Sequence, residues 1–487
     1  MARLQSINLP GRLHVLRVLL IAGILLATPA VGYIAVSQRI DPVFLLGALA
    51  GVLMLVVWQR RGSHFFEFGM LAIVLTAGLV SFFTLPTGRE SRIVVSLLIT
   101  FVLLATWLFQ MGWVERRIAV RPSPINRPVF TFVIVMILSY LWSLAFRDPI
   151  MFIWSSFPLV QVVALIVNIT FPLLLLLVAN KLNDPVWIGR LVVIFILLGV
   201  TSIILYFTNQ TIHDWFMYRG TRGLFSMWVA ALALSLALFH RKLPNWLRVL
   251  LVGLVLLLIY RYFFLGRSWV SGWLPMFVAL MAVVYLRSKR AFVILAVLGA
   301  IYLSFNFTYY FNNIVLAEEQ EGSGTGRVEL WERNLAHVAN HPLLGVGPAG
   351  YAIYNMTYHP SDARSTHNNY FDILAQTGII GFAAFLWLFG TLIHLARKTR
   401  SHLAARGDVL EAFSVAALAG GIGTIVGMML GDWVMPFAYN QTIAGFDNAA
   451  HTWILLGAMV ALYHMAAEGR LTPAGATTSE LAGSDEI

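Results

Sequence analysis

His367 is the candidate general base in this chain of 487 residues, and it lies in the polar run Ser-Thr-His-Asn-Asn-Tyr at 365–370. A neutral imidazole has an unperturbed pKa of about 6.5, so it can accept a hydroxyl proton near neutral pH. Lysine and arginine cannot readily do so. Asn368 and Asn369 follow directly and are candidate supporting residues.

Two other interpretations of this run stay open from the residues alone. Ser365, Thr366 and His367 could simply cap the helix that follows, since such caps are common. Three further histidines lie in the same polar region and are rival candidates for the base: His337, His341 and His359.

Arginines form a second set of candidates, because a guanidinium is permanently charged and forks onto phosphate oxygens. Arg219 and Arg222 lie in Tyr-Arg-Gly-Thr-Arg-Gly-Leu-Phe, and Arg267 lies in Leu-Gly-Arg-Ser-Trp. Others lie in the polar region itself: Arg327, Arg333 and Arg364. One such arginine could be reaching for lipid headgroups, but several converging on one face indicate a pyrophosphate site at a membrane surface.

Metal and cofactor chemistry is not expected. The chain has no cysteine, which excludes disulfides, thiolate nucleophiles and cysteine-bound metals. It also has no His-Glu-x-x-His motif of the kind that binds zinc on a helix. We therefore predict no metal and no cofactor.

Composition indicates a polytopic helical membrane protein, with 59% hydrophobic residues, 11% charged residues and a mean hydropathy of +0.80. A helix needs about 20 apolar residues to cross a bilayer. The fold class is thus all-α, with about 12–14 transmembrane helices and one large loop containing short helices. Fourteen spans are predicted near 13–36, 42–58, 68–84, 93–113, 129–146, 157–179, 186–207, 223–239, 247–264, 269–286, 291–311, 374–396, 412–431 and 449–465.

The basic clusters predict the orientation. Placing the N-terminus in the cytoplasm puts most Lys/Arg clusters inside, as the positive-inside rule requires, and this explains much of the net charge of +11 without nucleic acid. Both termini are then cytoplasmic and the loop at 312–373 is periplasmic. We divide the chain into N-terminal spans (1–200), a core with that loop (201–396), C-terminal spans (397–465) and a disordered cytoplasmic tail (466–487).

The sequence of this loop predicts short elements within it. A helix should begin near Arg327, place Leu330 and Leu335 on one side with Trp331 and Val338, and end at Asn-His-Pro, 340–342. The Gly-Val-Gly-Pro-Ala-Gly run at 345–350 should then form turns.

Four short motifs in this order resemble the O-antigen ligase and polymerase superfamily. They are Gly-Arg-x-x-Leu-Trp at 326–331, His-Pro-Leu-Leu-Gly-Val-Gly at 341–347, His-Asn-Asn-Tyr at 367–370 and Gln-Thr-Gly-Ile-Ile-Gly at 376–381. The resemblance covers roughly 200–390. Gly266 stands where the family has a serine before its arginine, and Met227-Trp228 stands where the family has Pro-Asn.

The resemblance implies a metal-independent glycosyltransferase of the bacterial inner membrane. Its donor would be an undecaprenyl-pyrophosphate-linked glycan, with Arg267 and either Arg219 or Arg222 on the pyrophosphate, Arg327 in support, and His367 activating the acceptor. The acceptor would be lipid A core for an O-antigen ligase, or another lipid-linked repeat for a polysaccharide polymerase. Membrane lipids are the other expected partners; the oligomeric state is not predicted.

Two functions of other classes stay open. A lipid-linked oligosaccharide flippase could also have fourteen spans, although transporters usually place polar residues near the bilayer midplane in paired halves. A non-catalytic partner in a polysaccharide secretion complex is the third interpretation, and such a partner should tolerate loss of His367.

Overall fold

The structure, a computed structural model, describes residues 64–79, 84–86, 92–218, 220–266, 269–312, 326–360, 362–437, 439 and 443–471. The first two predicted spans and the predicted C-terminal tail beyond 471 lie outside these residues. The chain divides into two compact units, Met1–Gly69 and Met70–Ile487. Of the first unit only 64–69, at the start of α3, are described.

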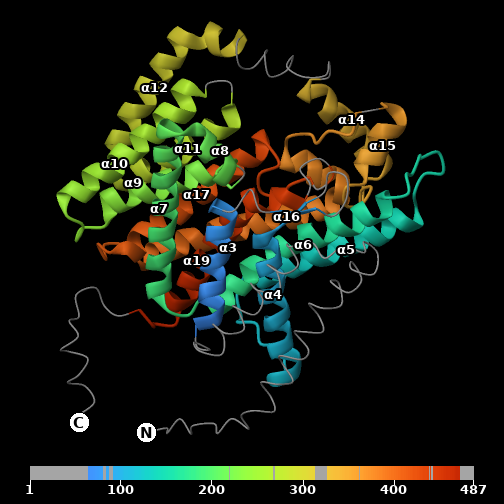
Figure 1. The fold of residues 1–487 in the computed structure, drawn as a ribbon, viewed down its shortest axis with the longest axis horizontal. Coiled ribbons are helices and arrows are strands. Elements are labelled where there is room, and N and C mark those ends of the chain that lie inside the picture. Colours follow the sequence, from blue (N-terminus) through green and yellow to red (C-terminus); the bar gives the residue numbers. More distant parts are fainter. Residues whose placement is uncertain are drawn as a thin grey trace. The chain divides into compact units, whose positions relative to one another are not determined.

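Nearly all described elements are helices (Figure 1). In chain order they are α3 (Phe65–Leu79), β1 (Thr84–Pro86), β2 (Arg92–Val94), α4 (Val95–Phe109), η2 (Gln110–Val114), α5 (Asn126–Ala145), α6 (Phe157–Lys181), α7 (Pro185–Thr208), α8 (Gln210–Phe216), α9 (Phe225–Phe239), α10 (Asn245–Ile259), η3 (Tyr260–Leu265), α11 (Val270–Arg287), α12 (Lys289–Tyr310), α14 (Arg327–Asn340), α15 (Tyr351–Tyr358), α16 (Asn369–His402), α17 (Val409–Leu430), η5 (Ile443–Gly445) and α19 (Phe446–Ala467). β1 and β2 form a two-stranded antiparallel sheet, which was not predicted.

Each predicted span from 68–84 onward overlaps an apolar helix, although α3 ends at Leu79 and Thr84 begins β1. Ten described helices are long and apolar enough to cross a membrane, and the shorter α3 and α9 are apolar as well. The prediction of an all-α polytopic membrane protein is therefore confirmed, because a run of about 20 apolar residues can satisfy its backbone in lipid only as a helix or within a closed barrel.

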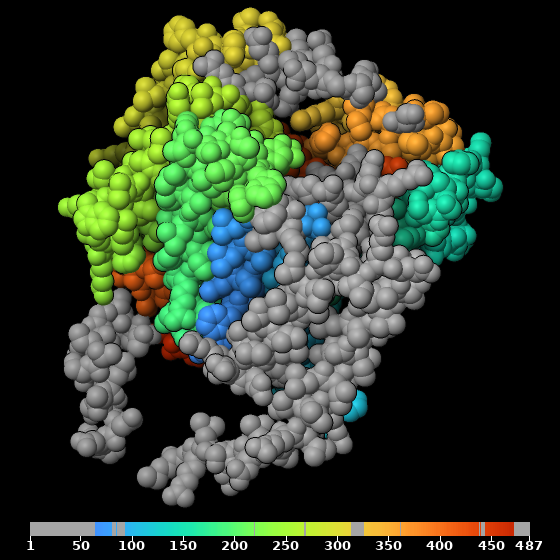
Figure 2. Space-filling model, viewed as in Figure 1, coloured from blue at the N-terminus to red at the C-terminus, as the bar shows by residue number. Residues whose placement is uncertain are grey.

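The core of the second unit is built around α17 and α19. α17 packs against α9, α11 and α16, while α19 packs against α6 and α16. α12 is the opposite case, since none of its residues is buried and it packs against α11. Its yellow surface lies at the rim of the face drawn in Figure 2. An apolar helix exposed to this extent is suited to contact lipid over most of its surface.

α16 is broken at Gly378, whose φ is +64°. The break releases main-chain groups from the helix ladder, and the turn at 342–347 binds them. The carbonyl of Ala375 accepts the N–H of Val346 at 3.0 Å, and the N–H of Ile379 donates to the Pro342 carbonyl at 2.8 Å. The predicted turn is thus confirmed, and main-chain bonds join it to the broken helix.

Glycine is required on both sides of this joint. Gly345 has a φ of +67°, and a Cβ there would come within 2.4 Å of the Ala375 carbonyl oxygen. A Cβ at Gly378 would lie 2.4 Å from main-chain atoms of Leu343. Both positions combine a left-handed backbone with a close approach of two chains, which L side chains do not tolerate.

α14 begins and ends where the sequence predicted, but its buried face differs from the prediction. Leu330 is buried, whereas Leu335 is 44% exposed. The inner face instead includes Asn334 and His337, and the His337 Nε2 lies 2.9 Å from the Asn355 Oδ1 on α15. Figure 1 shows α14 and α15 side by side. A polar side chain with a hydrogen-bond partner can thus occupy a position that hydropathy assigns to solvent.

Candidate functional site

His367 is held with its side chain outward between residues that are buried. Its side chain is 46% exposed, while Ser365, Thr366, Asn368 and Asn369 are each no more than 5% exposed. Its φ is +51°, a left-handed conformation that is uncommon for a residue other than glycine. Such a backbone persists only where the surroundings fix it, and it is often found at functional sites.

Asp432, in the segment that follows α17, faces the His367 ring. The His367 Nδ1 lies 4.0 Å from the Asp432 Oδ1 and 3.4 Å from the Ser365 Oγ. Asp432 is 1% exposed, and its Oδ2 accepts the N–H of Phe437 at 3.2 Å. The separation is too long for a hydrogen bond but short enough for the carboxylate to favour the imidazolium. The geometry therefore suits a base that gains positive charge.

The surroundings of His367, burial first among them, favour a neutral ring near neutral pH. Burial lowers its pKa, the Asp432 carboxylate raises it, and Arg327 and Arg364 lower it. Burial raises the pKa of Asp432, against the opposing effects of His367 and Arg222. A neutral imidazole with a carboxylate at its side is the state that accepts a proton.

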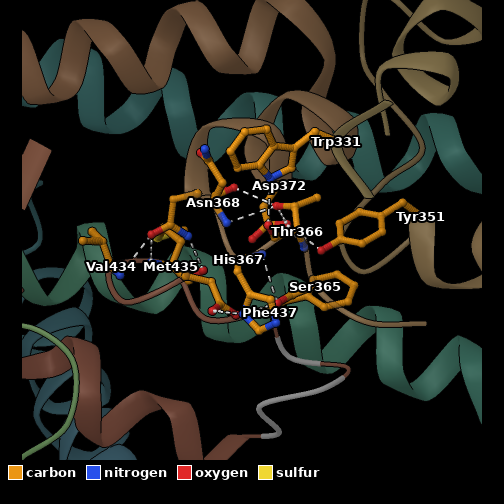
Figure 3. A network of polar contacts seen from close by, with 12 residues as sticks. Trp331, Tyr351, Ser365, Thr366, His367, Asn368, Asp372, Val434, Met435 and Phe437 are labelled. Carbon is orange, nitrogen blue, oxygen red and sulfur yellow. Dashed lines mark hydrogen bonds and ion pairs between the residues drawn. The ribbon is translucent and has the colours of Figure 1, made fainter. Parts of the chain in front are cut away.

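Asn369 fixes the Asp432 segment, whose Val434 and Met435 are labelled in Figure 3, against the start of α16. Its Oδ1 accepts the N–H groups of Val434 and Met435 at 3.1 and 3.3 Å, and its Nδ2 donates to the Met435 carbonyl at 2.7 Å. Asn368 has a different task, because its side chain accepts the N–H of Tyr370 at 3.0 Å and caps α16. The cap of this helix is therefore Asn368 and not the His367 ring.

Trp433, next to Asp432 in the chain, contacts the turn that carries Arg222 and the ring of Trp269. The Arg222 guanidinium lies 5.8 Å from the Trp433 ring, and a Cβ on Gly223 would come within 2.8 Å of that ring. From another direction the Trp269 ring contacts Trp433 at 5.9 Å, edge to face. Arg222 is thus brought to the His367 site, while the candidates Arg219 and Arg267 lie outside the described residues.

Two arginines of the polar region are tied into ion pairs with one carboxylate. Arg364 and Arg333 bind Asp362 at 2.8 and 2.9 Å, and Arg333 also pairs with Glu329. Arg364, followed by Arg333, lowers the pKa of Asp362 to about 2. These pairs join α14 to the segment before His367, so both arginines have a structural task. Arg327 acts on the His367 ring through its charge.

The rival histidines are more enclosed than His367. His337 is 8% exposed and bound to Asn355, and burial lowers its pKa. The Nε2 of His341 lies 3.2 Å from the Asp148 Oδ2 and 3.1 Å from the Tyr354 hydroxyl. His359 is half-buried at the end of α15. Among these four, His367 presents the most exposed ring.

A second polar cluster, not foreseen from the sequence, joins α7, α8 and η3. The Arg261 guanidinium donates to the Ser202 Oγ at 3.2 Å and contacts the His213 Nε2 at 3.2 Å. The His213 Nδ1 lies 2.8 Å from the Asp214 Oδ1. If the Nε2 accepts from arginine, the Nδ1 carries the hydrogen that Asp214 receives. The cluster fixes α8, which leads into the turn that carries Arg222.

The described residues contain no group of three His, Cys, Asp or Glu side chains placed to hold a metal ion. No curated protein matches the chain. Residues 263–386 match the family model described as O-antigen ligase; the match includes His367, Asn368 and Asn369, begins after Arg222 and ends before Asp432. The part of the chain from Phe263 to Leu386 is thus similar to the O-antigen ligase family, and this match supports the superfamily of lipid-linked glycan ligases and polymerases.

Proposed function

We propose that the protein transfers a glycan from an undecaprenyl-pyrophosphate donor to the hydroxyl of an acceptor sugar, on the periplasmic side of the bacterial inner membrane, and that it is an O-antigen ligase whose acceptor is lipid A core. The observation that carries the proposal is the exposed ring of His367 beside the buried carboxylate of Asp432, with Arg222 at the same site. The family match supports the class of reaction.

In the proposed step the acceptor oxygen attacks the anomeric carbon of the donor. A bond forms between that oxygen and the carbon, the bond from the carbon to the phosphate oxygen breaks, and the pyrophosphate leaves with the electron pair. His367 takes the acceptor proton. Arg222 and Arg267 stabilise the negative charge that develops on the leaving group, a task that a metal ion performs in many transferases.

The test is to incubate the purified protein, in lipid, with an undecaprenyl-pyrophosphate-linked repeat, with and without lipid A core. A ligase should extend lipid A core and should leave the lipid-linked repeat unextended in its absence. Longer lipid-linked chains made without lipid A core would show a polymerase instead. A protein that moves the donor across the bilayer without consuming it would be the flippase of the alternative interpretation.

Arg267→Lys should not restore the activity that Arg267→Ala loses. Lysine keeps the charge but lacks the planar fork that binds two phosphate oxygens at once, so we expect transfer to remain impaired in both variants. Initial rates at several donor concentrations measure this, and Arg287→Lys at the end of α11 is the matched control. Full activity in Arg267→Lys would mean that Arg267 only anchors its helix at the lipid headgroups.

A further inference from the structure

Asp372 is a buried carboxylate in the first turns of α16 that has no role in the proposed step. It is 1% exposed and lies where it cannot touch a substrate without rearrangement. Its Oδ1 accepts three hydrogen bonds: from the Thr366 hydroxyl at 2.6 Å, the Tyr351 hydroxyl at 2.6 Å and the Thr366 N–H at 3.3 Å. Burial of such a group is tolerated only when it is well bonded, so these contacts define what it does.

The other oxygen of this carboxylate shows that the arrangement is not set by stability alone. Asp372 Oδ2 is buried and has no hydrogen-bond partner among the described residues. A buried acceptor without a partner destabilises the fold. All of the hydrogen bonds of the Asp372 carboxylate therefore run through one oxygen, and two of these three bonds come from one residue, Thr366.

Thr366 is the residue directly before His367. It is fully buried, and its Oγ1 accepts the N–H of Asn368 at 3.2 Å while its hydroxyl donates to Asp372. Asp372 thus fixes Thr366, and Thr366 fixes the amide on the far side of His367. The left-handed backbone of His367 lies between these two bonds.

The hydrogen bonds that Asp372 accepts from Thr366 and Tyr351 form a clamp. Tyr351 extends this clamp to Asp432, the carboxylate that faces His367. Its hydroxyl donates to Asp372, and its ring stacks on Phe437 with centroids 4.2 Å apart and planes 8° apart. The N–H of Phe437 donates to Asp432. Figure 3 shows Asp372 bonded to Thr366 and Tyr351. One buried oxygen is therefore connected to both members of the His367–Asp432 pair.

We propose that Asp372 is a positioning residue for the transfer reaction, which fixes His367 through Thr366 and the Asp432 segment through Tyr351. The proposal rests on the proposed function, because it assigns the purpose of the clamp to the base. It makes Thr366 and Asp372 necessary for turnover but not for donor binding.

The experiment compares Thr366→Val, Thr366→Ser and Asp372→Asn in the full-length protein in lipid. Valine removes only the hydroxyl, whereas serine keeps it and should rescue. Misplacing a catalytic group by about 1 Å can reduce the rate about 100-fold, so we expect a fall of that order in kcat for Thr366→Val and Asp372→Asn, with the donor Kd changed less than about twofold. Thr377→Val is the matched control, because Thr377 is equally buried in α16 and bonds only the Ile373 carbonyl.

Hydrogen exchange over a peptide covering 362–371 gives a readout that does not depend on activity. The amides of Thr366 and Asn368 should exchange faster in Thr366→Val and Asp372→Asn, and at the wild-type rate in Thr366→Ser and His367→Asn. Unchanged exchange in the first two variants would refute the clamp, whatever their activity. Faster exchange with normal kcat would refute the positioning role. An active His367→Asn protein, measured in parallel, would show that the assignment of the base had failed instead.

Discussion

Replacing His367 with asparagine should abolish detectable transfer while the protein stays folded and binds its lipid donor. Removing a positioned general base reduces a rate by about 10²- to 10⁴-fold, because the acceptor hydroxyl then reaches the transition state with its proton. Asparagine is the informative replacement, since it tolerates the left-handed backbone at this position and cannot take a proton. The measurements are product formation from a lipid-linked donor and, separately, donor binding.

The control for this variant is His341→Asn. His341 lies in the same polar region and is bound to Asp148 and Tyr354, so its loss should affect local stability more than transfer. Normal turnover by His367→Asn would move the base to His337, His341 or His359, or would mean that no base is needed. Inactivity in both variants with lost donor binding would indicate a folding defect.

Asp432→Asn should reduce kcat, by up to the roughly 10⁴-fold seen when a catalytic triad loses the carboxylate that supports its imidazole. The amide can still accept the N–H of Phe437, so the segment should keep its place. Among the described residues, Asp432 is the group that raises the His367 pKa, against burial and two arginines. Its removal lowers that pKa further, and the acidic limb of the kcat–pH profile should move to lower pH.

Asp148→Asn is the matched control for the removal of this charge. Asp148 is an aspartate bound to His341, and it is not among the groups that act on the His367 pKa. Its profile should keep the wild-type acidic limb. If Asp432→Asn also kept that limb and its full rate, Asp432 would be a structural residue and His367 would act without a carboxylate.

The spans were predictable because hydropathy and length alone define them. A run of about 20 apolar residues has few other structures available, and each predicted span in the described part overlaps a helix. The helix from Arg327 and the turn at 345–350 could also be predicted from neighbouring residues, since Gly and Pro mark their ends. His367 could be singled out by residue type, because few side chains accept a proton at neutral pH.

The partners of His367 could not be predicted in this way. Asp432 follows a different span, and an aspartate after a transmembrane helix is usually a boundary residue. Only the fold, through the bonds of Asn369 to Val434 and Met435, brings it to the ring. The tasks of Arg333 and Arg364 were hidden for the same reason, because their shared partner Asp362 is identified by distance and not by spacing.

The main-chain joint between the turn at 342–347 and the broken α16 would allow the side chains that face the substrate to change during evolution. Its main-chain bonds link amides to carbonyls, so they depend on the backbone at Gly345, Gly347 and Gly378 more than on the side chains nearby. Substrate-facing side chains could then drift toward new sugars while the segment stays attached. We therefore expect homologues with different substrates to keep these glycines.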